Sequence, residues 1–495
     1  MKRYLSLFFL PSFLLLLGCA SFLSHRIPQT LERPRPCQEF FERLDEKVRE
    51  ADVRDASAFS VPGFPYLRTS RFLSALKESL KDEQERKIWV RWMQDLDLRS
   101  RKKEISNLPD EMVISLTSEK GRPDREGLAD QVESCSTDLL LHDHGRSGFY
   151  TSLEPFVGVP DEYSSILRTA GLYPLIALPV TVVTENSREK IRRRFDTDLK
   201  DLPVDGSLRT FVPGKEQSLG RERIQEIIEE SRENPLRVPF PDAIRKKELV
   251  EAFAPIFIQD MAASYDRLGE VRWKNHRMEI NPEKPTVYYY FSHALLKGEP
   301  ILQINYAIWY SERAGERPPS IEKGHLDGLT IRISLDDQGK LFMVEAMNNC
   351  GCYHLFAPDR ERVDRILPRP LMFDAMVPQW LPEISTGDRL GIRINSGWHQ
   401  VQRLISVKEA PDPVPYELVP YDVLETLPHE DGRTESIFNE HGIAKGSERV
   451  ERFLLFSMGI PSVGSMRQRG HHAIELIGRV HFDDPHLFDK NFIFK

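Results

Sequence analysis

The chain has 495 residues, of which 40% are hydrophobic and 29% are charged, and its formal net charge is −8. The length and the apolar fraction are those of a globular protein with two or more domains. The acidic balance, without any basic stripe along the sequence, argues against nucleic acid as a partner.

The first eighteen residues have the proportions of a signal peptide. Lys2 and Arg3 precede the apolar run 4–17, which is too short to span a bilayer, because a spanning helix needs about 20 apolar residues. The run ends in Leu-Leu-Gly-Cys at positions 16–19, which resembles the lipobox of bacterial lipoproteins. The resemblance implies cleavage after Gly18 and lipidation of Cys19 by acyl chains such as palmitate. Two or more acyl chains hold a protein stably on a membrane.

The residue after Cys19 bears on which membrane the anchor would enter. An aspartate there would be the familiar signal for retention in the inner membrane, and this chain has Ala20. The resemblance therefore implies a lipid anchor on the periplasmic side of the cell outer membrane. The alternative is an ordinary secretory signal followed by an incidental cysteine.

Residues 19–36 are polar and punctuated by proline, so we interpret them as a tether. Residues 37–275 are predicted to be mainly helical, since apolar residues recur at spacings of three and four between charges, as in Phe40, Phe41, Leu44 and Val48. No apolar run after residue 18 is long and uninterrupted enough to span a bilayer.

The pattern changes after residue 275. Residues 281–408 are rich in Val, Ile, Tyr and Phe and alternate with period two between turn residues, which predicts an antiparallel β-domain. Residues 409–495 begin with a proline-rich connection and continue as a mixed tail. The predicted fold class is therefore α+β, with a helical N-terminal region, an antiparallel β-domain and a mixed C-terminal tail.

Four cysteines follow Cys19: Cys37, Cys135, Cys350 and Cys352. The predicted compartment is oxidising, so disulfides are permitted there. Four cysteines allow three pairings, and the sequence does not choose among them. We favour a Cys37–Cys135 disulfide, because the other two cysteines belong to a separate cluster.

That cluster lies in a predicted hairpin, residues 324–355, whose turn is Asp336–Gly339. The odd positions of its first strand and the even positions of its second form the buried face, and Thr330, Arg332 and Ser334 face outward. A four-residue loop pairs Ile331 with Val344 and His325 with Cys350. A register slipped by two residues keeps the faces and places Asp327 opposite Cys350.

Either register gathers His325, Asp327, Cys350 and Cys352 at one end of the buried face, with His354 near them. Tyr310 or Glu312 of the preceding strand, and Trp398-His399 at a later strand end, could join this cluster.

Four interpretations of the cluster compete. The side chains could simply satisfy one another at the rim of the core. His325, Cys350, Cys352 and His354 could bind a metal, with zinc as the metal that suits such ligands. Cys352 could be a nucleophile that His325 deprotonates and Asp327 supports, as catalytic residues. A Cys350–Cys352 disulfide would require Gly351 to break the strand, because residues two apart in a strand lie too far apart for one.

The two functional hypotheses follow from these interpretations. One is a lipid-anchored envelope enzyme, a metal- or thiol-dependent hydrolase or acyl transferase acting on envelope material. Its Gly351-Cys352 stretch is loosely similar to the active-site motif of the L,D-transpeptidases, although Cys350 and His354 stand where that motif has histidine and arginine. The other is a non-catalytic binding or scaffolding lipoprotein with a structural cluster.

Overall fold

The computed structural model describes residues 33–117, 122–215, 219–385 and 387–495. The predicted signal peptide and the lipidation site Cys19 lie outside these residues. The helices are α1 Arg35–Glu50, α2 Arg71–Leu76, α3 Glu83–Asn107, α4 Asp110–Leu116, α5 Arg125–His144, α6 Phe149–Leu153, α7 Ser165–Ala170, α8 Tyr173–Asp196, α9 Arg221–Ser231, α10 Ala243–Phe253, α11 Glu451–Leu454 and α12 Leu487–Asn491.

The strands lie mostly after α10 in the chain. They are β1 Phe59–Val61, β2 Phe64–Thr69, β3 Ser207–Pro213, β4 Ile256–Met261, β5 Glu270–Lys274, β6 Arg277–Asn281, β7 Thr286–Leu296, β8 Glu299–Arg313, β9 Gly324–Leu335, β10 Leu341–Asn348, β11 Leu355–Pro358, β12 Val363–Ile366, β13 Arg389–Ile394, β14 Val401–Val407, β15 Pro413–Pro420, β16 Leu427–Pro428, β17 Thr434–Glu435 and β18 Phe492–Phe494. The protein is therefore of mixed α+β class, as predicted.

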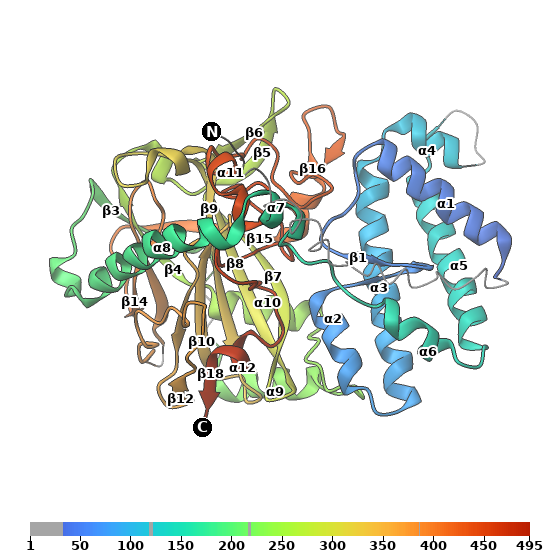
Figure 1. The fold of residues 1–495 in the computed structure, drawn as a ribbon, viewed down its shortest axis with the longest axis horizontal. Coiled ribbons are helices and arrows are strands. Elements are labelled where there is room, and N and C mark those ends of the chain that lie inside the picture. The colour runs from blue at the N-terminus through green and yellow to red at the C-terminus, as the bar shows by residue number, and fades with distance from the viewer. Residues whose placement is uncertain (1–32, 118–121, 216–218, 386) are drawn as a thin grey trace, which may run out of the picture.

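The N-terminal helices form one side of the molecule and the large sheet forms the other (Figure 1). A long α3 packs against α5 and β2, and α1 packs against α5. A disulfide joins Cys37 of α1 to Cys135 of α5, which confirms the predicted pairing. Its sulfurs are surrounded by the apolar side chains of this helical body.

The large sheet has ten strands in the order β11-β10-β9-β8-β7-β15-β3-β4-β13-β14. The prediction of a purely antiparallel sheet is wrong: β15 pairs in parallel with both β7 and β3, and β13 pairs in parallel with β4. Two strands come from the region predicted to be helical. Residues 256–261 form β4 because the helix before them ends at Phe253, where Ala254 and Pro255 break it.

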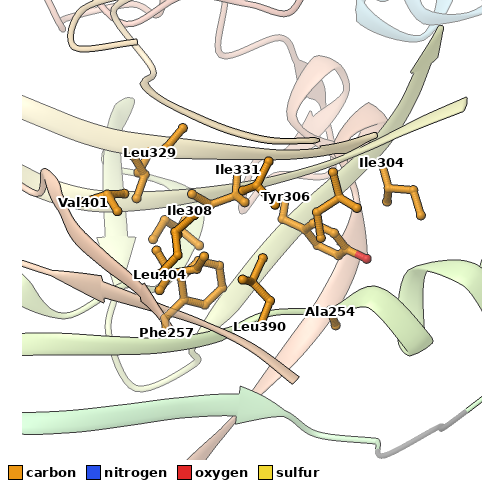
Figure 2. Packing of buried hydrophobic residues seen from close by; sticks show 14 of the residues in the cluster. Ala254, Phe257, Ile304, Tyr306, Ile308, Leu329, Ile331, Leu390, Val401 and Leu404 are labelled. Carbon is orange, nitrogen blue, oxygen red and sulfur yellow. The ribbon is translucent and has the colours of Figure 1, made fainter. Parts of the chain in front are cut away.

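The hairpin β9–β10 has the predicted faces and the register slipped by two. Ile331 pairs with Ala346 and Ile333 with Val344, because an irregularity between Leu341 and Met343 shifts the pairing after the turn. The odd side chains of β9 are buried in the main core with Phe257, Tyr306 and Leu404, as Figure 2 shows. The odd positions of β9 therefore form a buried face, as predicted.

The opposite face of this hairpin is also buried, contrary to the expectation that Thr330, Arg332 and Ser334 face outward. The C-terminal tail covers it. Arg332 is 1% exposed, pairs with Glu345 at 2.6 Å, and lies 3.6 Å from the ring centre of Phe482. Helices α9 and α10 contribute to the core on the first face, so the sheet is covered on both sides. No helix in the described residues is long and apolar enough to cross a membrane.

Candidate functional site

The site is built around Asp327, a fully buried carboxylate on β9. Arg313, at the end of β8, donates two hydrogen bonds to it, from Nε at 3.0 Å and from Nη2 at 2.9 Å. The Nδ1 atom of His399 lies 2.8 Å from the same carboxylate. Burial alone would raise the pKa of Asp327, but the charge of Arg313 and the bond with His399 outweigh it and hold the pKa well below its usual range.

His399 lies between two carboxylates. Its Nε2 atom is 3.3 Å from Asp266 Oδ1, and its ring stacks on Tyr310 with the ring centres 3.8 Å apart. Burial alone would lower the pKa of His399, but the interactions with Asp266 and Asp327 outweigh it and raise the pKa. The ring therefore lies between Asp327 at its Nδ1 atom and Asp266 near its Nε2 atom, and both carboxylates favour its charged form.

A tight turn brings His399 to this position. Gly397 has φ of +70°, and a Cβ there would lie 2.2 Å from the carbonyl oxygen of Ala314. Only glycine tolerates both conditions. The Gly397 N–H then donates to Asp266 at 2.8 Å, so the turn closes directly onto the carboxylate that holds His399.

Arg313 also connects this carboxylate cluster to the cysteines. Its Nη1 atom donates to Glu322 at 3.0 Å, and its Nη2 atom lies 3.9 Å from Cys350 Sγ. Glu322 accepts further hydrogen bonds from the Tyr353 hydroxyl at 2.7 Å and the Trp398 indole at 2.8 Å. One guanidinium therefore contacts two carboxylates and a sulfur.

The two thiols lie in a turn that follows β10. Gly351 has φ of +89°, and a Cβ there would lie 2.3 Å from the carbonyl oxygen of Ala473, so the strand breaks at the residue where a Cys350–Cys352 disulfide would require it. Both thiols are free. The Cys352 N–H donates to Cys350 Sγ at 3.4 Å.

The environment makes the two thiols unequal. Burial would raise the pKa of Cys350, but the hydrogen bond from Cys352 and the charge of Arg313 outweigh it and lower the pKa to about 7. The same hydrogen bond, together with burial, raises the pKa of Cys352 well above its usual range. Cys350 is the buried thiol and Cys352 the partly exposed one. Cys350 therefore has the lower pKa of the two thiols and is the sulfur that loses its proton first.

A buried carboxyl group completes the surroundings of the thiols. Burial, together with the negative charges of Glu322 and Cys350, raises the pKa of Glu451 to about 8. This carboxyl group is therefore neutral at pH 7.

The predicted cluster is thus assembled in part. Asp327 and Cys350 both contact Arg313, and Cys352 contacts Cys350. His325 turns away: it is exposed, and its Nε2 atom lies 3.0 Å from the carbonyl oxygen of Met278. The cause is Leu326, whose φ of +58° breaks the alternation of the strand. Asp327 therefore supports His399 and not His325, so the predicted catalytic arrangement is not the one found.

The prediction of a metal site is wrong. The described residues contain no group of three or more His, Cys, Asp or Glu side chains that could hold a metal ion. His354, a predicted ligand, pairs with Glu345 at 2.9 Å beside Arg332. Cys350 contacts a guanidinium, which repels a cation. The described residues therefore do not support zinc as a cofactor.

Sequence reasoning named some of the partners and missed others. Tyr310 and the pair Trp398-His399 were expected to line the cluster, and all three do. Glu312 is exposed. Arg313, Asp266 and Glu322 were missed. Arg313 is three residues after Tyr310 on the same strand, so its place near the cluster could have been predicted from the sequence. Asp266 lies in a short 3₁₀ turn without a periodic pattern, so its place could not.

Comparisons with protein-family models, with curated proteins and with solved structures give no match to this chain. The arguments about its function therefore rest on the residues of the site itself.

The account predicts that Asp327→Asn destabilises the protein by about 3–5 kcal/mol at pH 7, because it leaves two buried cations, Arg313 and His399, without their shared carboxylate. Glu451→Gln is the matched control, and it should change stability by less than about 1 kcal/mol, since that carboxyl group is already neutral. Urea unfolding of the three proteins measures both effects. Equal losses in the two variants would contradict the assigned charges.

Proposed function

We propose that the protein is a lipid-anchored protein of the cell envelope, on the periplasmic side of the outer membrane, that carries out thiol–disulfide exchange through Cys350 and Cys352. The observation that carries this proposal is the thiol pair itself. Both cysteines are free, the Cys352 N–H donates to Cys350 Sγ at 3.4 Å, and Arg313 Nη2 lies 3.9 Å from the same sulfur. Thiolates, not thiols, attack disulfides, and a thiol with a pKa near the ambient pH is the best attacking group.

The exchange reaction balances as follows. The Cys350 thiolate takes the proton of the partly exposed Cys352, whose sulfur attacks one sulfur of a partner disulfide. The partner's S–S bond breaks, and its second sulfur leaves as a thiolate that takes the proton from Cys350. The Cys350 thiolate then attacks Cys352 Sγ and releases the first partner sulfur as a thiolate. The Cys350–Cys352 pair is oxidised by two electrons and the partner disulfide is reduced by two electrons.

This proposal replaces the thiol-dependent hydrolase or acyl transferase expected from the sequence. That chemistry requires a base beside the nucleophile, and the base assigned to it, His325, contacts Met278 on the outside of the sheet. The lowered pKa of Cys350 depends on a second thiol and a guanidinium, which is the environment of a reactive cysteine pair. The lipid anchor is supported by the lipobox resemblance at residues 16–19.

The test is a pH titration of the thiolate ultraviolet absorbance, followed by incubation with oxidised glutathione and peptide mapping. The reduced protein should release its first thiol proton near pH 7. Cys352→Ala should raise that value, because it removes the donor to Cys350. Glutathione disulfide should yield a Cys350–Cys352 disulfide in the wild type.

A wild-type protein whose thiols both titrate at the ordinary value of about 8.5 or above, and that forms no internal disulfide, would overturn the exchange proposal. The cluster would then be structural, as in the non-catalytic scaffolding alternative. Lipid labelling of Cys19, lost in Cys19→Ser, tests the anchor separately.

A further inference from the structure

A cavity of about 410 Å³ lies where the segment 54–59 of the helical body, the loop 160–164 and the C-terminal tail meet. Its lining combines charged side chains with the apolar surfaces of Phe59, Pro160 and Ile443. A volume of this size suits a small-molecule ligand, for which pockets of about 300–1,000 Å³ are usual.

Arg467 is a buried cation of this lining that Glu162 attracts from beyond ion-pair distance. It is 2% exposed, and its Nη2 atom donates to the carbonyl oxygens of Pro461 and Ser462. Its Nε atom is buried without a hydrogen-bond partner, and it forms no ion pair with any carboxylate in the described ranges of the chain. A buried cation without a counter-ion costs several kcal/mol.

Two carboxylates of the same cavity contact arginines that lie outside its lining. Glu162 lies 3.9 Å from Arg71 and 3.0 Å from the ring of His471. Asp161 pairs with Arg479. Asp161 also contacts His481, but burial lowers the pKa of His481 to about 4, so that ring adds no positive charge near pH 7. The side chain of Glu440 is 39% exposed, so water screens its charge. The cavity lining therefore has an excess of unpaired positive charge, which favours an anion as its ligand.

A second cation of the lining, Arg54, is exposed to solvent and is also without a carboxylate partner among the described residues. Its Nη2 atom donates to Ser60 Oγ at 3.4 Å. We propose that the cavity binds a small organic anion, a carboxylate or a phosphate monoester. Its charged group contacts Arg467 and Arg54, and its apolar part lies against Phe59, Pro160 and Ile443. This proposal does not depend on the thiol chemistry.

Titration calorimetry of the whole mature chain with four related probes tests this. Benzoate and phenyl phosphate should bind, whereas benzamide, which is neutral, and benzylammonium, which is cationic, should not. Whichever of benzoate and phenyl phosphate binds more tightly identifies the ligand as a carboxylate or as a phosphate monoester. Arg467→Gln should weaken binding at least tenfold. Arg433→Gln, at an exposed arginine that pairs with Asp431 outside the cavity, should not.

Because Arg467→Gln could also disturb folding, a second variant keeps the Arg467 charge and fills the cavity with a larger side chain. Ala58 lines the cavity and is 2% exposed, so Ala58→Met should abolish binding while Arg467 remains. Binding of all four probes alike, binding of none, or unchanged affinity in both variants would overturn the proposal.

A different observation carries a second inference. Large apolar side chains are exposed together on α7, α8, α11 and the 3₁₀ turn Phe456–Met458, which pack on one another (Figure 1). They are Ile166, Leu172, Leu175, Ile176, Leu178, Val182, Val183, Val450, Phe453, Leu454 and Phe456, with exposures from 39% to 80%. Monomeric soluble proteins rarely expose so many contiguous apolar groups, and such patches mark interaction sites.

The pattern along α8 is that of a helix that faces an apolar medium. At 100° per residue, Leu175, Ile176, Leu178, Val182 and Val183 fall within about half of the helix circumference, and all five point outward. The second half of α8 has five basic and three acidic residues. An apolar face next to a basic segment is the composition of a helix that lies in the surface of an anionic membrane.

The position of the anchor favours the same partner. Thirteen residues lie between Cys19 and Arg33, the first described residue, and a segment of that length reaches at most about 50 Å. We infer that this apolar surface lies on the lipid bilayer, and the inference rests on the proposed lipid anchor.

Flotation of the unacylated Cys19→Ser mature chain with vesicles of phosphatidylethanolamine and phosphatidylglycerol tests the surface without the anchor. We expect binding, reduced at least tenfold by Leu175→Ser, Leu178→Ser and Phe453→Ser together. The control combines Leu208→Ser, Ile244→Ser and Leu371→Ser, which are equally exposed elsewhere, and it should bind like the parent.

Absence of vesicle binding, or equal losses in both triple variants, would overturn the inference. A parent protein that self-associates through these residues in sedimentation, and does not float, would assign the surface to a second copy of the chain. Failure of lipid labelling at Cys19 with vesicle binding intact would refute the anchor and leave the surface assignment standing.

Discussion

The ion pair between Asp327 and Arg313 is the interaction on which the rest of the site depends. It is fully buried, so both charges have lost water and each requires the other. Arg313 has N–H donors that Asp327 does not use, and these contact Glu322 and Cys350. Asp327 has lone pairs that Arg313 does not use, and one of its oxygens also contacts His399. One buried pair thus links β8, β9, the β13–β14 turn and the cysteine turn.

This arrangement explains why the acidic thiol is the more buried one. A buried cysteine ordinarily has a raised pKa, because a thiolate is poorly solvated there. Cys350 has the guanidinium and the Cys352 donor on one side and the negative charge of Asp327 on the other. The balance favours the thiolate only while Arg313 is held in place, and Asp327 holds it. The carboxylate that resembled part of a catalytic triad therefore acts on the cysteine through the arginine.

The faces of the hairpin and its contribution to the core could be predicted from the alternation of residues 329–346, because side-chain period alone decides them. The register could not, since the irregularity at Leu341–Met343 leaves no mark in the apolar pattern. The direction of His325 could not either, because Leu326 adopts a left-handed conformation that its residue type does not favour.

Contacts between residues far apart in the chain could not be predicted from local patterns either. The parallel pairing of β15 with β3 joins residues about 200 positions apart, and no local pattern encodes it. The buried Arg332 looked like a surface residue because the tail that covers it, with Phe482, lies 150 residues later. The cysteine pair was found because two free thiols with a glycine between them are a local signal.

The central claim, a buried charge network in which His399 is the second cation, has a direct test. Since the pKa of His399 is raised, its contribution to stability is complete below about pH 6.5 and is lost as the pH rises through the raised value. Nitrogen-15 NMR of the imidazole, assigned with His399→Gln, reports its protonation at each pH. The account predicts an imidazolium with both nitrogens protonated that titrates above pH 6.5. A neutral ring at pH 6, with one nitrogen unprotonated, would contradict it.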